Sequence, residues 1–337
     1  MKFLKILGII VLALILIVVI LALIAPKSYD VGRDIEINAE KELVFQQMQL
    51  WRNWGAWSPW AERDSTMKIT IEGIDGQEGS KYVWKGDPKI TGSGEITNTG
   101  VKPNEEMTYH LHFMIPWESE SDGYVRVADA DNGTRASWGF AGKYTIPMNI
   151  LLLFMPMDKM MGPDFERGLA LLKEVVESKA SKMANLAVNE TTYKSANYAA
   201  IRQQVKMSEL ESFYASSFEM INKAMESRGA SMTGAPAGIF YSWEPEKGLS
   251  DMAAGIPVRR KVESDNVETI NVPGGNALSI DFYGPYEEIE LAHMVLMKYV
   301  QKNGLTLKWP MIEEYLTDPA SVSDPNKWLT RVTYFVE

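Results

Sequence analysis

Residues 309–328 read WPMIEEYLTDPASVSDPNKW, and this stretch decides the fold of the C-terminal half of the chain. Its landmarks repeat an earlier segment at a constant offset of 74 residues, which indicates an internal duplication. The matched positions are Pro236 and Pro310, Tyr241 and Tyr315, and Pro245 and Pro319. One copy is too short to bury both faces of a sheet, so two copies are expected to share one core, with a groove at their pseudo-twofold seam.

Helix signals near these segments predict a strand, a helix and a strand pair in each copy. Ser208 and Glu211 have the spacing of a capping box before an apolar stripe, and Gly229 marks the end of that helix. Pro285 and Gly304 mark the start and the end of the second helix. Each copy is therefore predicted as a mixed α+β unit.

The run P-x-x-E-x-Y-L-T-D-P at residues 310–319, followed by D-P-x-x-W at residues 324–328, resembles the GyrI-like effector-binding domain. The resemblance covers residues 193–337 and implies a small-molecule-binding domain made of two pseudo-repeated strand-helix-strand-strand units. The family includes the drug-sensing halves of transcription regulators and stand-alone binding proteins. Because this sequence shows no DNA-binding half, ligand binding is the role that carries over.

The candidate site centres on Glu313. The 74-residue offset pairs it with Ile239, so one copy has a carboxylate where the other has an apolar side chain. Strand alternation lets only one of Glu313 and Glu314 face inward, and in the resembling family the residue that matches Glu313 contacts bound ligands. The alternative is that both are solvated acids on an edge strand.

A carboxylate among aromatic rings suits a cationic ligand, because a cation is attracted both to the charge and to the ring faces. We therefore expect a binding site with aromatic walls. Its expected residues are Glu313, Tyr315, Tyr283, Trp309, Trp243 and Tyr241.

Residues 29–180 show a strand, a helix, short strands separated by glycine, and one long amphipathic helix. Asn38 is expected to cap the first helix and Pro163 to open the last one. Asp131-Asn132-Gly133 is a hairpin signal. The strands are expected at residues 31–37, 68–72, 80–85, 94–97, 107–113, 123–128 and 135–140. This order predicts a curved sheet wrapped around the long helix.

Three segments together resemble the START-like superfamily, also called SRPBCC or polyketide cyclase-like. They are Trp57-Ser58-Pro59-Trp60, the strand from Gly79-Ser80 to Trp84, and residues 165–173, FERGLALLK. The resemblance implies a helix-grip fold with an apolar ligand chamber between the sheet and the long helix. The candidate lining residues are Trp57, Trp60, Trp84 and Trp138, and the alternative is that such tryptophans are core and loop anchors.

Residues 6–25, ILGIIVLALILIVVILALIA, form an uncharged apolar run long enough to cross a membrane. Residues 1–28 are therefore predicted to be a transmembrane anchor. A cleaved signal peptide is the alternative, but Pro26 would follow the cut. Because Lys2 and Lys5 precede the run without an acid, we expect a single-pass protein of the cytoplasmic (inner) membrane with extracytoplasmic soluble domains. Residues 181–192 are small and polar, which predicts a linker between the two domains.

Composition argues against several classes of function. The net charge of -10 gives no basic stripe for nucleic acid, and the absence of cysteine excludes disulfides and thiolate nucleophiles. No phosphate-binding loop, strand-linked G-x-G-x-x-G or nucleophile elbow occurs, so no cofactor is expected. His110 and His112 share a strand face, but no third ligand accompanies them, so no metal is expected.

The leading hypothesis is a membrane-anchored protein that binds or senses a small lipid-like or aromatic, cationic ligand. The alternative is a hydrolase or other enzyme acting on a small apolar electrophile, with Glu313 as acid and base. A scaffold in which both cavities are closed is the third possibility. The partners that the sequence indicates are the small molecule and the membrane, and nucleic acid is not expected.

Overall fold

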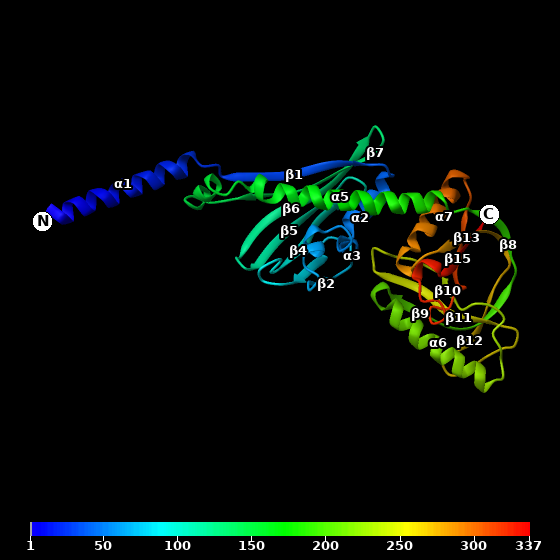
Figure 1. Cartoon of the computed structure of the whole chain (residues 1–337). Helices are drawn as coiled ribbons and strands as arrows, with labels where there is room; N and C mark the ends of the chain where they lie inside the picture. The colour runs from blue at the N-terminus through cyan, green and yellow to red at the C-terminus, as the bar shows by residue number, and fades with distance from the viewer. Residues whose placement is uncertain (1) are drawn as a thin grey trace. The chain divides into compact units, whose positions relative to one another are not determined.

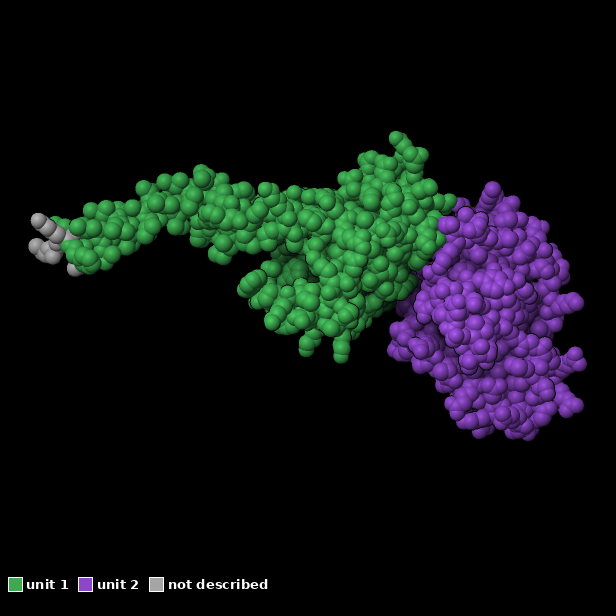
Figure 2. Space-filling view, viewed as in Figure 1, with its two compact units in different colours: residues 1–180 green, residues 181–337 purple. Residues whose placement is uncertain are grey.

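The computed structural model describes residues 2–337, apart from the side chains of residues 2 and 4. The chain divides into two compact units, Met1–Ala180 and Ser181–Glu337 (Figure 2). Each unit has its own antiparallel sheet (Figure 1). The fold is mixed α+β, as the order of elements in the sequence predicts.

Helix α1 (Lys2–Ile24) has no charged residue after Lys5. Its segment Lys5–Ile24 is long and apolar enough to cross a membrane, judged by length and composition. Such a helix has no polar side chain with which to satisfy the carbonyl groups at its own C-terminal end.

Asn149 supplies that partner. It lies in the 3-10 helix η1 (Met148–Leu153), and its Nδ2 donates to the carbonyl oxygens of Ala22 at 2.8 Å and Ala25 at 3.2 Å. Asn149, Ala22 and Ala25 are all buried. The last turn of α1 is therefore packed against the folded part of the first unit.

The first sheet has seven strands in the order β1-β7-β6-β5-β4-β3-β2, and all neighbours are antiparallel. All the strands expected from the sequence are present. Ala130 pairs with Gly133, so Asp131 and Asn132 form the predicted two-residue turn. The strands are β1 (Ser28–Ile37), β2 (Lys68–Glu72), β3 (Lys81–Lys85), β4 (Ser93–Lys102), β5 (Glu106–Ile115), β6 (Ser119–Ala130) and β7 (Gly133–Lys143).

The helices of the first unit differ from prediction at their starts. Helix α2 begins at Lys41 without a side-chain cap, so Asn38 is not its cap. Helix α5 begins at Met157, and Pro163 lies inside it. Arg33 on β1 explains this early start, because it binds acids on both sides of that proline. Its partners are Asp158 at 2.8 Å and Glu166 at 2.7 Å. The helices are α2 (Lys41–Gln49), α3 (Trp51–Trp54), α4 (Pro59–Arg63) and α5 (Met157–Ala184).

The connection between the units is shorter than the expected linker at residues 181–192. Helix α5 continues to Ala184, and strand β8 (Asn189–Tyr193) pairs with a strand of the second sheet. The polar side chains of β8 are compatible with this because backbone groups make the pairing. Only residues 185–188 are irregular.

The second sheet has eight strands in the order β12-β9-β11-β10-β14-β15-β13-β8. The predicted duplication is confirmed: β9-α6-β10-β11 and β13-α7-β14-β15 repeat one plan and meet where β10 pairs with β14. The capping box is wrong, because α6 begins at Leu210 after a short 3-10 turn and has no side-chain cap. The elements are β9 (Ala196–Lys206), η2 (Met207–Glu209), α6 (Leu210–Ser227), β10 (Ala237–Phe240), β11 (Leu249–Val258), β12 (Glu268–Val272), β13 (Gly275–Tyr283), η3 (Tyr286–Glu288), α7 (Glu290–Lys302), β14 (Leu307–Tyr315), η4 (Pro325–Lys327) and β15 (Leu329–Val336).

The 74-residue offset does not preserve the faces of these strands. Ile239 pairs with Ile312, and both belong to the apolar cluster on one side of the sheet. Gly238 pairs with Glu313, so Glu313 points to the other side. The pairing of β14 with β15 has a register shift between Lys308 and Met311, the segment that contains Pro310.

Separating the units is expected to leave both folded, because each has its own sheet and buried core. A protease site placed within residues 185–188 should release two fragments that each unfold in one cooperative calorimetric transition. An uncut chain with the same insertion serves as the control. Loss of the transition in either fragment would show that the units share a core.

Candidate functional site

A buried carboxylate lies at the junction of the two repeats. Glu313 is on β14, the fifth of the eight strands in spatial order, and exposes 9% of its surface. Its Oε1 lies 2.9 Å from His293 Nε2, and the Tyr315 hydroxyl donates to its Oε2 at 3.0 Å. His293 Nδ1 lies 2.9 Å from the Tyr334 hydroxyl. The alternative of a solvated edge-strand acid is therefore wrong for Glu313.

Gly238 makes room for this arrangement on the neighbouring strand. A Cβ atom there would lie 2.1 Å from the Tyr214 hydroxyl and 3.1 Å from the Tyr315 hydroxyl. Any larger side chain would push the two tyrosines away from the carboxylate that Gly238 faces. The sequence therefore places a glycine directly opposite Glu313.

Aromatic rings from several elements surround Tyr315. The Tyr214 ring on α6 meets it edge to face at 5.7 Å, and the Tyr286 ring on η3 meets it at 5.4 Å. Tyr286 in turn packs against Trp328 at 5.0 Å, and Phe218 stacks on Tyr214 at 5.6 Å. The carboxylate of Glu313 thus lies beside a wall of rings drawn from both repeats.

The hydroxyl groups of this cluster remain protonated. Burial, followed by the nearby charge of Glu313, raises the pKa of Tyr315 and that of Tyr214 well above the ordinary value. Burial and Glu313 also raise the pKa of Tyr334. The Tyr315 hydroxyl therefore stays available to donate to Glu313.

The other aromatic residues expected at the site lie outside this cluster. Tyr241 packs on the opposite side of the sheet, where the Arg202 guanidinium lies 3.5 Å from its ring centre, so the offset placed it on the wrong face. Trp243 contacts Phe240 at 5.8 Å and is 43% exposed. Tyr283 and Trp309 lie at the surface, 63% and 45% exposed.

Glu314 points to the face opposite Glu313 and is half-buried. Burial raises its pKa, while the charge of Arg331 acts in the other direction. On the same side, the hydroxyls of Tyr193 and Tyr198 are 2.7 Å apart, and Glu314 helps to raise the pKa of both. The two adjacent acids therefore belong to separate environments.

Three of the candidate tryptophans of the first unit pack on one another. Trp57 and Trp138 are at most 1% exposed and 4.9 Å apart, and Trp60 meets Trp138 at 5.4 Å. Trp84 is buried against Phe113. Indole nitrogens donate to protein atoms, as Trp138 does to the Tyr109 hydroxyl at 2.9 Å. This packing agrees with the alternative that these tryptophans are core anchors.

Sequence reasoning missed four members of the Glu313 cluster: His293, Tyr214, Tyr286 and Tyr334. A signal for His293 existed, because it follows Ile289 by four residues and so borders the apolar stripe of α7. Tyr214 directly follows Phe213, one of the buried residues of α6. His110 and His112, the histidines considered for a metal, pair instead with Asp122 and Glu118 at the surface.

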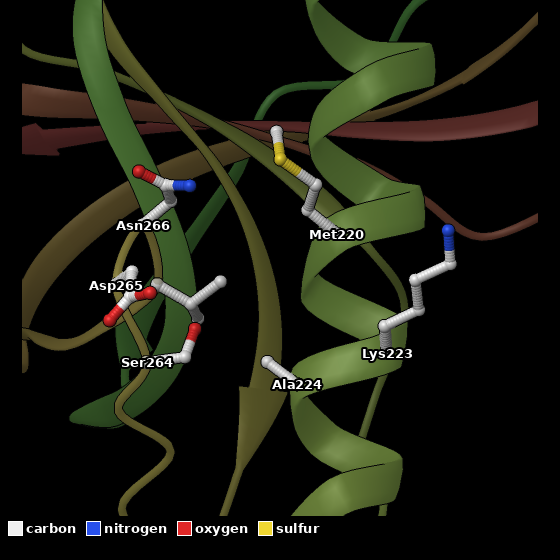
Figure 3. A pocket seen from close by; sticks show the side chains of 7 residues that line it. Met220, Lys223, Ala224, Ser264, Asp265 and Asn266 are labelled. Atoms are coloured by element: carbon white, nitrogen blue, oxygen red, sulfur yellow. The ribbon is translucent and has the colours of Figure 1, made fainter.

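A shallow depression of about 320 Å³ lies elsewhere on the second unit, between α6 and the loop before β12 (Figure 3). Met220 and Lys223 form one side, and Asp265 and Asn266 form the other. Lys223 is already paired with Glu219. This depression contains no residue of the Glu313 cluster and has no aromatic lining, so Glu313 is the better candidate site.

Comparison with known proteins identifies the second unit. Residues 187–334 match the GyrI-like small molecule binding domain, which confirms the resemblance drawn from residues 310–328. The START-like resemblance of residues 29–180 stays a prediction. No curated protein sequence is similar enough to count as a match.

Solved structures with a similar fold are distant. The EcmrR C-terminal domain is 19% identical and covers 45% of this chain and 98% of its own, with a TM-score of 0.41. EcmrR in a DNA complex is 15% identical and covers 62% and 88%, with a TM-score of 0.42. A hydrolase encoded by lin2189 from Listeria innocua is 11% identical and covers 48% and 98%, with a TM-score of 0.33.

Proposed function

We propose that the GyrI-like domain at residues 187–334 binds a planar aromatic, cationic small molecule beside Glu313, and that α1 anchors it to a membrane. The observation that carries the proposal is a single carboxylate, 9% exposed, beside a wall of aromatic rings at the junction of the repeats. Burying a carboxylate is costly because its charge loses contact with water, so an acid buried at this junction needs a functional reason.

The chemistry of the cluster selects the ligand class. Each carboxylate oxygen contacts one protic group, and because a carboxylate offers about four acceptor positions in all, Glu313 retains capacity for a ligand. A cation over a tyrosine or tryptophan face gains about 0.5–2 kcal/mol. Tyr286 and Trp328 lie on short irregular segments rather than in the sheet, so we place the entrance at these two rings.

Direct titration tests this proposal. Full-length protein in detergent micelles should bind a planar cationic dye such as ethidium, measured by fluorescence anisotropy, and should bind the anionic dye fluorescein at least about tenfold more weakly, or about 1.4 kcal/mol. Equal binding of the two dyes would contradict a site built around a carboxylate.

Catalysis is the second candidate function. His293 and Tyr315 both contact Glu313 within the distances that general acid and base groups require. In this version Glu313 activates water against a small electrophile. Turnover of an epoxide that Glu313→Gln abolishes without loss of dye binding would favour an enzyme.

The first unit supports a START-like helix-grip assignment through its order of elements. Helix α5 crosses the sheet with Phe165 4.8 Å from Trp138 and with Gly168 so close that a Cβ atom would lie 2.4 Å from that indole. We assign the ligand site to the second unit, because the tryptophans of the first unit are packed together.

The anchor is proposed to be retained and to place both units outside the cytoplasm. The bonds from Asn149 to Ala22 and Ala25 support retention, because cleavage after Ala25 would remove partners from a buried amide. A phosphatase fused after Glu337 should therefore be active outside the cytoplasm, and mass spectrometry of the mature protein should recover residues 1–25. Reporter activity that is detected only after cell lysis would show that the C-terminus lies in the cytoplasm, which is the opposite orientation.

A further inference from the structure

We infer that the first unit inserts the loops at one end of its strands into the interface of the membrane that α1 spans, and that η1 is the centre of this contact. The inference rests on the proposed anchor. It adds a lipid-binding surface that is separate from Glu313 and from α1 itself.

The first observation is the depth of η1. Asn149 bonds to Ala22, which lies within the apolar segment Lys5–Ile24. Residues beside Asn149 must therefore lie level with the last turn of the membrane-spanning segment. A polypeptide at that level is in contact with the boundary between lipid headgroups and acyl chains.

The second observation is the character of the residues at that level. Around the buried Asn149, the segment at residues 146–160 exposes apolar side chains where a water-facing loop would carry polar ones. Phe154 is 71% exposed, Met148 53%, Ile146 52% and Met160 51%. Lys159 and Lys143 are exposed beside them, in position to reach phosphate groups.

The third observation is that other loops at the same end of the strands also expose apolar side chains. β1 enters at Ser28 paired with Lys143, and Asp122, three residues after Ser119, pairs with Ala141 near the same end of β7. The hairpin tip before Ser119 therefore lies at this end, and its Trp117 is 81% exposed. Tryptophan is enriched at membrane interfaces because its ring is apolar and its N–H is polar.

The loop between β3 and β4 is the third loop at this end of the strands. A Cβ atom on Gly92 would lie 1.9 Å from the Ile115 carbonyl oxygen, so this loop is adjacent to the β5–β6 hairpin. Its Ile90 is 54% exposed, and Ile115 is 43% exposed. Three loops thus present apolar side chains on the side where α1 joins the sheet, and a bilayer covers all three at once.

The experiment uses the full chain, which contains no cysteine, so single cysteines can be labelled uniquely. Phe154→Cys and Trp117→Cys carry an environment-sensitive fluorophore in vesicles of phosphatidylcholine and phosphatidylglycerol. Asp131→Cys is the matched control, since it lies at the opposite end of β6, about 40 Å away at 3.3 Å per residue. Leu14→Cys reports on the anchor itself. Melting curves identify any variant that fails to fold, and Met148→Cys then replaces it.

We expect the labels at 154 and 117 to be quenched by lipids with a nitroxide near the glycerol backbone, and their quenching by aqueous iodide to be about fivefold weaker than that of the label at 131. Iodide quenching equal to that at 131, with the label at 14 quenched by lipids that carry the nitroxide deep in the acyl chain, would overturn this inference and leave the anchor intact. Absence of lipid quenching at 14 would overturn the anchor as well. Protection from iodide without lipid quenching would mean contact with a second copy of the chain, and would also overturn the inference.

Discussion

Glu313→Gln is expected to weaken the binding of a cationic aromatic dye by about tenfold or more, equivalent to about 1.4 kcal/mol. The substitution keeps the size of the side chain and an acceptor for the Tyr315 hydroxyl, but it removes the negative charge from a site that is 91% shielded from water. Charge matters most where solvent is excluded, because screening is weak there. Fluorescence anisotropy with the full chain measures the change.

The melting temperature should stay the same or rise in this variant. A buried charge is costly to desolvate, and removal of a functional group that is not optimal for stability commonly stabilises a protein. His293 and Tyr315 would then face an amide in place of a carboxylate. A fall in both stability and binding would indicate that Glu313 has a structural role.

Glu314→Gln is the matched control, because it makes the same chemical change one residue along the same strand. Glu314 faces the other side of the sheet, near Tyr193 and Tyr198. Dye binding should therefore be unchanged within about twofold. Equal effects of the two substitutions would contradict a binding site at Glu313 and would point to a general effect of net charge.

The duplication could be predicted from the sequence because prolines and tyrosines recur at a constant offset of 74 residues in the two copies. The choice between Glu313 and Glu314 could not be made from the offset, because side chains alternate and a one-residue shift reverses the face. Only the pairing of Glu313 with Gly238 determines which acid points toward α6 and α7.

The partners of Glu313 were harder to predict than its face. His293 and Tyr334 are separated from it by 20 and 21 residues in opposite directions, and Tyr214 by about a hundred. Strand and helix periodicities describe neighbours on one element, whereas this cluster combines five elements, β14, β15, α6, α7 and η3. In the first unit the sequence signals were local, since strand alternation and the Asp131-Asn132 turn predicted the sheet correctly. The spacing of the tryptophans did not reveal whether they enclose a chamber or fill it.

Trp138→Ala tests whether the tryptophans fill the first unit, and it is expected to destabilise that unit by about 3–5 kcal/mol. The Trp138 ring lies 4.9 Å from Trp57 and 4.8 Å from Phe165, and its N–H donates to the buried Tyr109 hydroxyl. Truncation removes these contacts and leaves the Tyr109 hydroxyl without its donor. The loss is large because the surrounding core can collapse only in part into the cavity.

The measurement is the melting temperature of the first unit. It should fall by about 10 °C, because each kcal/mol of destabilisation lowers the melting temperature of a domain of this size by about 2–4 °C. The melting temperature of the second unit should stay the same. Trp117→Ala is the control: Trp117 is 81% exposed, so its loss should change stability by less than about 0.5 kcal/mol. The cavity created at position 138 should also bind indole and recover part of the lost stability, whereas the unmodified protein should not respond to indole. If Trp138→Ala costs less than about 1 kcal/mol and indole stabilises the unmodified protein, these rings line an open chamber, and the first unit is itself a binding domain.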